Sequence, residues 1–378
     1  HNNKGTVKDD FIGGDTTIKH AEGGSNITLA TGNNNINLSD ADEVTAVLNA
    51  LASKLTYENY IKENGGERNL NGNVIIASGL TASSITADVK GFIKFDEATG
   101  VGGYVKPQEG EQNSTEITSG LTGTAADSDY TDANIRQDDG SYSFTKSTTI
   151  DVEDGTAIDA AANIKINAED AALTLNAKQG IVTNGKNVDI DARTLYISAN
   201  EDAIVADGGK VTSLGMTNIN NEDKTDNPAA KNAIKAINGA AVTLGNGVIK
   251  GNVISDGSAV SINKDNLDSD GNHKTGSLEG NLAIANGGVI DLTVAGYAQK
   301  FNGSVVKIGD VATAAVGDDG KVNLTVADGA VWTGAHKNAD AELNLTLSGG
   351  TWNNTGTDAT LVNTLKGGKG VVKTIKYI

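Results

Sequence analysis

Two pairs of adjacent acidic residues are the first groups in this chain that could do chemistry. Asp138-Asp139 and Asp318-Asp319 each stand directly before a glycine. Two carboxyl groups on either side of a glycosidic bond can act as the acid and the base of a glycoside hydrolase. Acidic residues followed by glycine are also typical of tight turns, because both residue types tolerate turn backbone angles. We interpret both pairs as turns and predict no catalytic residue.

A second candidate for chemistry is an incomplete calcium-binding pattern. Asn266, Asp268, Asp270 and Gly271 match the first half of a calcium loop, but the twelfth position is Ser277 instead of glutamate. No helical pattern flanks the segment, so we interpret it as a solvated turn. The histidines also lack the spacing of metal ligands. They are His1, His20, His273 and His336. We expect no metal and no cofactor.

The two tryptophans allow two interpretations. Trp332 and Trp352 are 20 positions apart (352 − 332), and Gly334 and Gly356 follow them closely. Stacked indole rings can bind a sugar, and large aromatic residues can equally fill the core at the end of a repetitive fold. We favour the second interpretation, in which the tryptophans close the final coils.

The composition excludes several classes of protein. The chain has 378 residues with 47 glycines, 2 prolines, no cysteine and few aromatic residues (5 Phe, 8 Tyr and 2 Trp). A net charge of −18 disfavours nucleic acids and anionic membranes as partners, because binding phosphate requires clustered Lys and Arg. No run of 18 apolar residues is present, so no membrane-spanning helix is predicted. Sequence motifs of serine hydrolases, zinc proteases and phosphate-binding loops are absent as well.

A short sequence repeat gives the strongest structural signal. Each repeat begins with a small residue followed by isoleucine. The first residues of the repeats are Ala157, Gly180 and Ala203, at intervals of 23 residues (180 − 157 and 203 − 180), and Ala233 after an interval of 30. We attribute the longer interval to an extra loop within the polar segment 218–231. A short repeat built from strands is typical of a solenoid, in which each repeat packs only on its neighbours.

Pairs of aliphatic residues two positions apart lie within these repeats. Alternation with polar residues places one set of side chains inside and the other outside. The pairs are Ile150/Val152, Ile164/Ile166, Leu173/Leu175, Val188/Ile190 and Leu195/Ile197. Three such strands in every 22–24 residues predict an all-β protein, a right-handed parallel β-helix of three strands per coil.

One segment has helical instead of strand periodicity. Asp40 and Glu43 resemble a capping box, and apolar residues follow at helical spacing until the Asn64-Gly65 stop signal. We therefore predict a short helix over about 41–56, packed against an end or flank of the stack. The apolar residues of this pattern are Val44, Val47, Leu48, Leu51 and Leu55.

Four regions follow from these patterns. We predict N-terminal coils with the helical insertion over 1–104, and a polar protrusion or loose coils over 105–145. Regular coils follow over 146–310, and a C-terminal cap covers 311–378.

The C-terminal region resembles a known family. Val331-Trp332-Thr-Gly, the segment from Leu343 to Gly356 and the segment from Leu361 to Leu365 are similar to the end of a passenger domain of a Gram-negative type V autotransporter adhesin, of the pertactin-like or diffuse-adherence type. In that family the segment forms the last coils of a right-handed β-helix and is called the autochaperone. The resemblance implies export to the bacterial cell surface or secretion, and a signal peptide and translocating barrel outside this chain.

Three functions are compatible with these observations. We expect a non-enzymatic adhesin passenger that mediates attachment, self-association or biofilm formation through its polar outer face. Its partner would be a glycan or protein receptor on a host or bacterial surface, or another copy of itself, without nucleic acid and without direct membrane insertion. The alternatives are a polysaccharide-degrading β-helix enzyme and a structural coat or spacer protein.

Overall fold

The computed structural model describes residues 115–221, 232–269, 271–297, 299–310 and 319–374, together with the backbone of seven strands between residues 17 and 105. The chain divides into two compact units, residues 1–107 and residues 108–378. The helix predicted over 41–56 and most of the loop predicted within 218–231 lie outside the described residues.

The first unit contains two small sheets. One sheet has the order β1-β2-β4-β5 and the other has the order β3-β6-β7. Only β2 and β4 pair in parallel, and the other pairs are antiparallel. These pairings differ from the parallel coils predicted for residues 1–104, because alternation of apolar and polar residues suits both kinds of sheet. The strands are β1 (Thr17–His20), β2 (Ile27–Thr31), β3 (Glu67–Asn69), β4 (Gly72–Ser78), β5 (Ser84–Val89), β6 (Phe92–Phe95) and β7 (Gly102–Val105).

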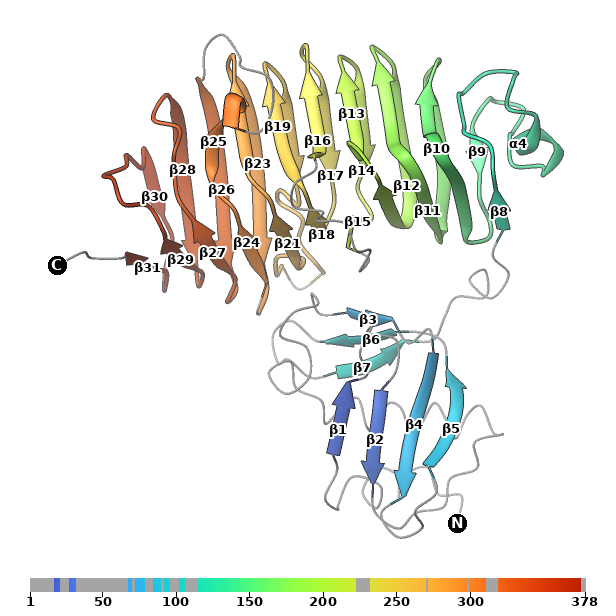
Figure 1. The fold of residues 1–378 in the computed structure, drawn as a ribbon, viewed down its shortest axis with the longest axis horizontal. Helices are drawn as coiled ribbons and strands as arrows, with labels where there is room; N and C mark the ends of the chain where they lie inside the picture. The colour runs from blue at the N-terminus through green and yellow to red at the C-terminus, as the bar shows by residue number, and fades with distance from the viewer. Residues whose placement is uncertain are drawn as a thin grey trace. The chain divides into compact units, whose positions relative to one another are not determined.

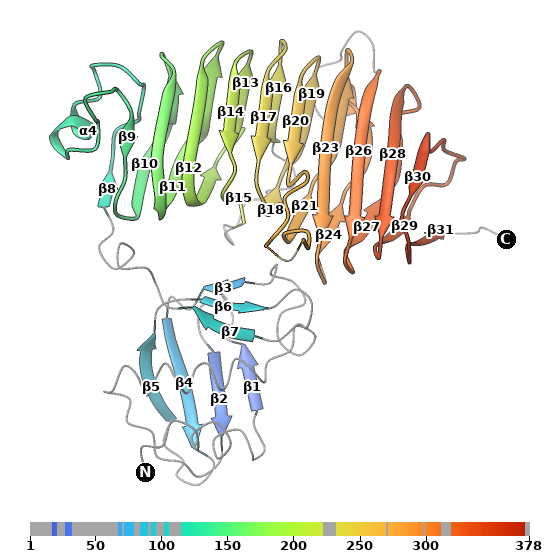
Figure 2. The same cartoon turned by 180° about the vertical axis from the view of Figure 1, so that it is seen from behind.

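The described part of the second unit is all-β, as predicted, and its 24 strands join in one sheet. Figures 1 and 2 show these strands side by side in chain order, from β8 in green to β31 in red. A five-residue helix, α4 (Ser128–Asp132), lies near β8 and β9. The strands up to β12 are β8 (Thr115–Ile117), β9 (Tyr142–Ser143), β10 (Thr148–Ala160), β11 (Ile164–Asn184) and β12 (Asn187–Ala199).

Shorter strands follow β12. They are β13 (Ile204–Asp207), β14 (Lys210–Ser213), β15 (Met216–Ile219), β16 (Asn232–Ile237), β17 (Ala241–Leu244), β18 (Gly247–Lys250), β19 (Asn252–Asp256), β20 (Ala259–Ile262), β21 (Gly276–Glu279), β22 (Leu282–Ala285), β23 (Gly288–Ala295), β24 (Lys300–Asn302) and β25 (Val305–Lys307). After the 3₁₀ turn η3 (Ile308–Asp310) come β26 (Gly320–Ala327), β27 (Val331–Gly334), β28 (Ala341–Ser348), β29 (Thr351–Asn354), β30 (Thr364–Lys366) and β31 (Val371–Thr374).

The strand pairing repeats along the second unit. From β13 to β24, each strand pairs in parallel with the third strand after it. From β26 onward, each strand pairs with the second strand after it. We call a group of successive strands that pairs with the next such group a layer. A layer has three strands where each strand pairs with the third strand after it, and two strands from β26 onward. The sequence repeat corresponds to this repeated strand pairing, because Ile158 pairs in register with Ile181, Ile181 with Ile204, and Ile204 with Ile234.

The core consists of columns of side chains that run from layer to layer. Each column member stands opposite its counterpart on the paired strand, so a buried aliphatic residue in one layer packs on another in the next. One column is Ile117, Ile150, Leu175, Ile197, Ile219, Ile249, Leu278, Phe301, Trp332, Trp352 and Val372. All its members except Val372 are buried. A second column begins at Tyr142 and ends at Leu324, Leu345 and Leu365.

The two tryptophans belong to the first of these columns. Trp332 is 0% exposed and Trp352 is 3% exposed. Their interpretation as large core residues of the final layers is therefore confirmed, and their buried rings are not available to stack on a sugar.

Candidate binding face

Polar side chains form a continuous outer surface on strands β26, β28 and β30. Along β26, the buried residues Val322, Leu324 and Val326 alternate with partly exposed residues. This alternation recurs on β28, so residues of the same kind stand opposite each other in register. We call the outward residues Asn323, Thr325, Asn344, Thr346, Thr364 and Lys366 the binding face.

Hydrogen bonds between layers hold the amides of this face. Asn344 Nδ2 donates to Asn323 Oδ1 at 3.0 Å, and Asn323 Nδ2 donates to Asp291 Oδ1 at 2.6 Å. Asp291 in turn accepts a hydrogen bond from Lys264 Nζ at 3.3 Å. Because each amide orients the next, these side chains need little further ordering when a partner binds.

The binding face lines a hollow of about 360 Å³. Its floor includes Leu324 and Leu345, and the other lining residues are those of the binding face. Amides and hydroxyls can both donate and accept hydrogen bonds, and Lys366 adds a single cationic donor. This arrangement can bind a neutral polar partner such as a sugar or a polar protein surface.

Of the two acidic pairs in the sequence, Asp138-Asp139 lies in a turn. The Asp139 carboxylate accepts hydrogen bonds from the backbone nitrogen of Ser141 at 2.9 Å and from its hydroxyl at 2.6 Å. These bonds hold the pKa of Asp139 below its ordinary value. Asp319 accepts a backbone hydrogen bond from Gly287, while Asp318 lies outside the described residues. The interpretation of Asp138-Asp139 as a turn is confirmed.

The incomplete calcium pattern also forms a turn. Gly271 donates its backbone N–H to the carbonyl of Asp268, and Asn272 donates to the Asp268 carboxylate at 2.9 Å. Asp270 lies outside the described residues. In the part of the chain that the structure describes, no three His, Cys, Asp or Glu side chains form a group that could hold a metal ion.

His336 is buried near the last layers. One of its ring nitrogens, Nε2, lies 3.1 Å from the carbonyl oxygen of Ala341, and burial lowers the pKa of the ring. This setting keeps the imidazole neutral near pH 7, as expected for a core residue.

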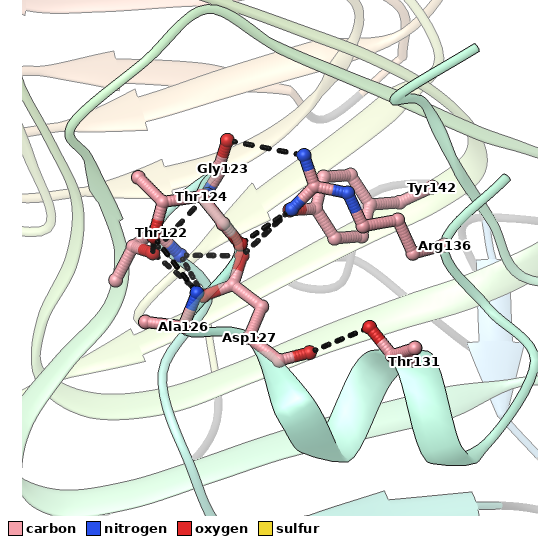
Figure 3. A network of polar contacts seen from close by, with 8 residues as sticks. All are labelled: Thr122, Gly123, Thr124, Ala126, Asp127, Thr131, Arg136 and Tyr142. Atoms are coloured by element: carbon pink, nitrogen blue, oxygen red, sulfur yellow. Dashed lines mark hydrogen bonds and ion pairs between the residues drawn. The ribbon is translucent and has the colours of Figure 1, made fainter. Parts of the chain in front are cut away.

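A polar network close to α4 is the feature that the sequence patterns did not reveal (Figure 3). The buried carboxylate of Asp127 accepts hydrogen bonds from the Thr122 hydroxyl at 2.6 Å, the Gly123 backbone at 2.8 Å and the Tyr142 hydroxyl at 2.6 Å. Arg136 lies 3.9 Å from Asp127 and donates to the Tyr142 hydroxyl at 2.9 Å. We call these five residues the cap network.

The cap network determines the protonation of its members. Burial alone would raise the pKa of Asp127, but the hydrogen bonds from Thr122, Tyr142 and Gly123 outweigh burial, so the pKa lies below its ordinary value. Burial and the neighbouring Asp127 carboxylate raise the pKa of Tyr142. Asp127 is therefore ionised and Tyr142 is protonated near neutral pH, which suits a structural role.

Aromatic packing joins the cap network to the core. The ring of Tyr130 on α4 meets the ring of Tyr142 edge to face at 5.9 Å, and it meets Phe144 in the same way at 6.4 Å. Tyr130 and Tyr142 are both fully buried. This end of the second unit is thus closed by α4 and the residues that flank it.

Comparison of the chain with family models, with curated proteins and with solved structures gives no match. Among the described residues, no helix is both long enough and apolar enough to cross a membrane. Because no known protein matches, we infer a function from the binding face.

Proposed function

We propose that the second unit is a right-handed parallel β-helix with three strands per coil over most of its length. The parallel pairing of each strand with the third strand after it supports this architecture. The in-register recurrence of Ile158, Ile181 and Ile204 at 23-residue intervals supports a coil of 22–24 residues. A shaft of this kind gives its outer faces a fixed spacing of about 4.8 Å between layers.

We further propose that this shaft is a non-enzymatic adhesin passenger. It would act at a bacterial surface or after secretion, as the resemblance of residues 330–375 to autotransporter passengers implies. The observation that carries the proposal is the row of oriented amides and hydroxyls over the hollow of about 360 Å³. A surface that is already ordered loses less entropy on association than a mobile one.

Two partners suit this face, namely a glycan receptor and a second copy of the chain. Asn and Thr side chains can pair with sugar hydroxyls, and they can also pair with the same residues on another shaft. Self-association works against the net charge of −18 on each copy. Added salt screens this repulsion, so clumping of cells that carry the chain should increase between low salt and about 0.15 M.

An attachment assay on cells that display the full chain tests this function. Replacing Asn323 and Asn344 together by alanine should reduce attachment or clumping at least about tenfold, because each layer loses its oriented amide. The matched control replaces Thr149 and Thr174, which are partly exposed polar residues on β10 and β11 away from the binding face. The control variant should behave as the unchanged chain does.

Other outcomes of this assay discriminate between the three functions. If both double variants attached equally well, the binding face would not be the surface that mediates attachment. Lack of attachment by the unchanged chain at every salt concentration would favour a coat or spacer protein. Release of sugars from a panel of polysaccharides would favour the degrading enzyme.

A further inference from the structure

A histidine occupies a core position that is aliphatic in the preceding layers. A third column of buried residues runs in register through the stack, and His336 stands opposite its last aliphatic member, Val305. The column is Leu121, Ile158, Ile181, Ile204, Ile234, Val253, Leu282 and Val305. These aliphatic side chains are all 0% exposed, and His336 is 9% exposed. A titratable ring therefore stands where the repeat otherwise places a hydrocarbon.

The ring of His336 is incompletely paired in this position. Its Nε2 lies 3.1 Å from the carbonyl oxygen of Ala341, and its Nδ1 is buried without a hydrogen-bond partner. A neutral imidazole can place its single N–H on Nε2 and leave only a lone pair unpaired on Nδ1. A protonated imidazole carries an N–H on both nitrogens, so it would bury one unpaired donor as well as a charge.

No carboxylate pairs with this ring within the described part of the chain. Asp340 pairs with Lys307 on β25 at 3.6 Å, and Glu342 on β28 pairs with Lys321 at 3.9 Å. Two further charged residues of the neighbouring segments are exposed, Lys337 and Asp358. The pKa of the ring is set by burial and by a backbone carbonyl, without a contribution from a charged side chain. An imidazolium here would be a buried charge without a partner, which is strongly destabilising.

Segment 335–341 joins the preceding layer without forming a strand. His336 makes an isolated bridge to Val305, in which the Val305 N–H donates to the Ala335 carbonyl at 2.9 Å and the Lys337 N–H donates to the Val305 carbonyl at 2.7 Å. The amide of Asn338 reaches the carbonyl oxygens of two inner strands only at 3.4 Å. A segment held by an isolated bridge can open while the longer ladders of the stack stay closed.

We propose that His336 makes segment 335–341 an acid-sensitive closure of the stack. Protonation in mild acid drives the imidazolium out of the column into water, and the segment opens with it. The opened state leaves the side chain of Val305 uncovered and its backbone N–H and carbonyl unpaired. The earlier layers remain closed, because their members of this column do not titrate.

The direction of the effect follows from the two states of the ring. Burial lowers the pKa of the closed ring below its ordinary value of 6.5, whereas the ring of an opened segment is in water. Closure is therefore fully stable above pH 6.5 and loses stability as the pH falls from there through the pKa of the closed ring. From pH 7 to pH 5, opening should become at least about fivefold more frequent, with a limit of about 25-fold if the closed ring binds no proton.

Hydrogen exchange of the full chain at pH 7 and pH 5 tests this inference. Protection factors, which correct for the pH dependence of exchange itself, should fall by the same fivefold to 25-fold at the N–H groups of Val305 and Lys337. The N–H of Ile181 donates to Ala203 in earlier layers and is the internal control. Its protection should not change, and a fall of equal size there would overturn the proposal, because the whole stack would then loosen in acid.

Two variants remove the titrating ring. His336→Leu returns the column to an aliphatic residue, and His336→Gln keeps a side chain that can donate to the Ala341 carbonyl. In both variants, protection at Val305 and Lys337 should be equal at pH 7 and pH 5. His273→Gln is the matched control, because His273 lies between β20 and β21, and this variant should keep the fall seen in the unchanged chain.

Two results would overturn the proposal. One is a fall in protection that persists undiminished in both His336 variants, and the other is constant protection in the unchanged chain between pH 7 and pH 5. None of the replaced residues belongs to the binding face, so this experiment and the attachment assay can fail separately.

Discussion

The indole rings of Trp332 and Trp352 stack face to face, with centroids 4.3 Å apart and planes 3° from parallel. Phe301 extends the stack on the other side of Trp332, with ring centroids 5.6 Å apart. Each indole N–H donates to a backbone carbonyl of the preceding layer, Trp332 to Gly303 at 2.9 Å and Trp352 to Gly334 at 3.1 Å. The stack fixes the register of the last layers through both packing and hydrogen bonds.

Removing the outer ring of this stack should loosen the C-terminal layers. We expect Trp352→Ala to lower the free energy of unfolding of β27–β31 by about 3–5 kcal/mol, because a large buried side chain is lost and its cavity remains. Hydrogen exchange of the backbone amides in β27, β29 and β31 measures the change. Trp352→Phe keeps most of the ring contact and should cost much less, so an equal loss in both variants would contradict the stacking argument.

A close backbone approach beside the tryptophans gives a second prediction. A Cβ atom at Gly334 would overlap the carbonyl oxygen of Gly303 on the paired layer, whereas a Cβ atom at Gly368 would meet nothing within 4 Å. We expect Gly334→Ala to destabilise the protein by about 3 kcal/mol, since the backbone must shift to make room. Gly368→Ala should be nearly neutral. Thermal unfolding of both variants measures the difference, and similar melting temperatures would show that the layers can separate at little cost.

Asp127 should make the stability of the cap depend on pH. Its folded pKa lies below the ordinary value of 3.8, so its contribution is fully present above the unfolded pKa and is lost as pH falls through the folded pKa. At pH 7, Asp127→Asn should lower the free energy of unfolding of the cap by about 3 kcal/mol, because buried donors and Arg136 lose a charged acceptor.

The measurement compares Asp127→Asn with the unchanged chain at pH 7 and in acid near pH 3. The difference in unfolding free energy should narrow in acid, where protonation begins to remove the charge from Asp127 in the unchanged chain as well. Asp138→Asn is the control, because Asp138 is an exposed acid of the same region. A difference that stays constant over this pH range would show that the carboxylate charge is not what stabilises the network.

The sequence predicted the repeated layers because their signal is local and periodic. Ile158, Ile181 and Ile204 recur at a fixed interval, and the structure sets them side by side in register. The cap network could not be predicted in this way, because Asp127 and Tyr142 are 15 positions apart in an aperiodic segment. The hydrogen bond between Asp291 and Asn323 could not be predicted either, since these residues are 32 positions apart and the repeat has an interval of about 23.

A series of asparagine hydrogen bonds between successive layers leads to the last prediction. Asn252 Oδ1 accepts the backbone N–H of Asn281 at 2.9 Å, and Asn281 Oδ1 accepts the backbone N–H of Ser304 at 2.9 Å, so each layer satisfies a donor of the next. We expect Asn281→Leu to lower the unfolding free energy by about 1–3 kcal/mol, because the Ser304 N–H loses its acceptor. Asn281→Asp keeps an oxygen at that point and should recover most of the loss. Hydrogen exchange at Ser304 reports the bond directly. Unchanged protection in the leucine variant would mean that water or another acceptor replaces the amide, and it would contradict a stabilising role for this bond.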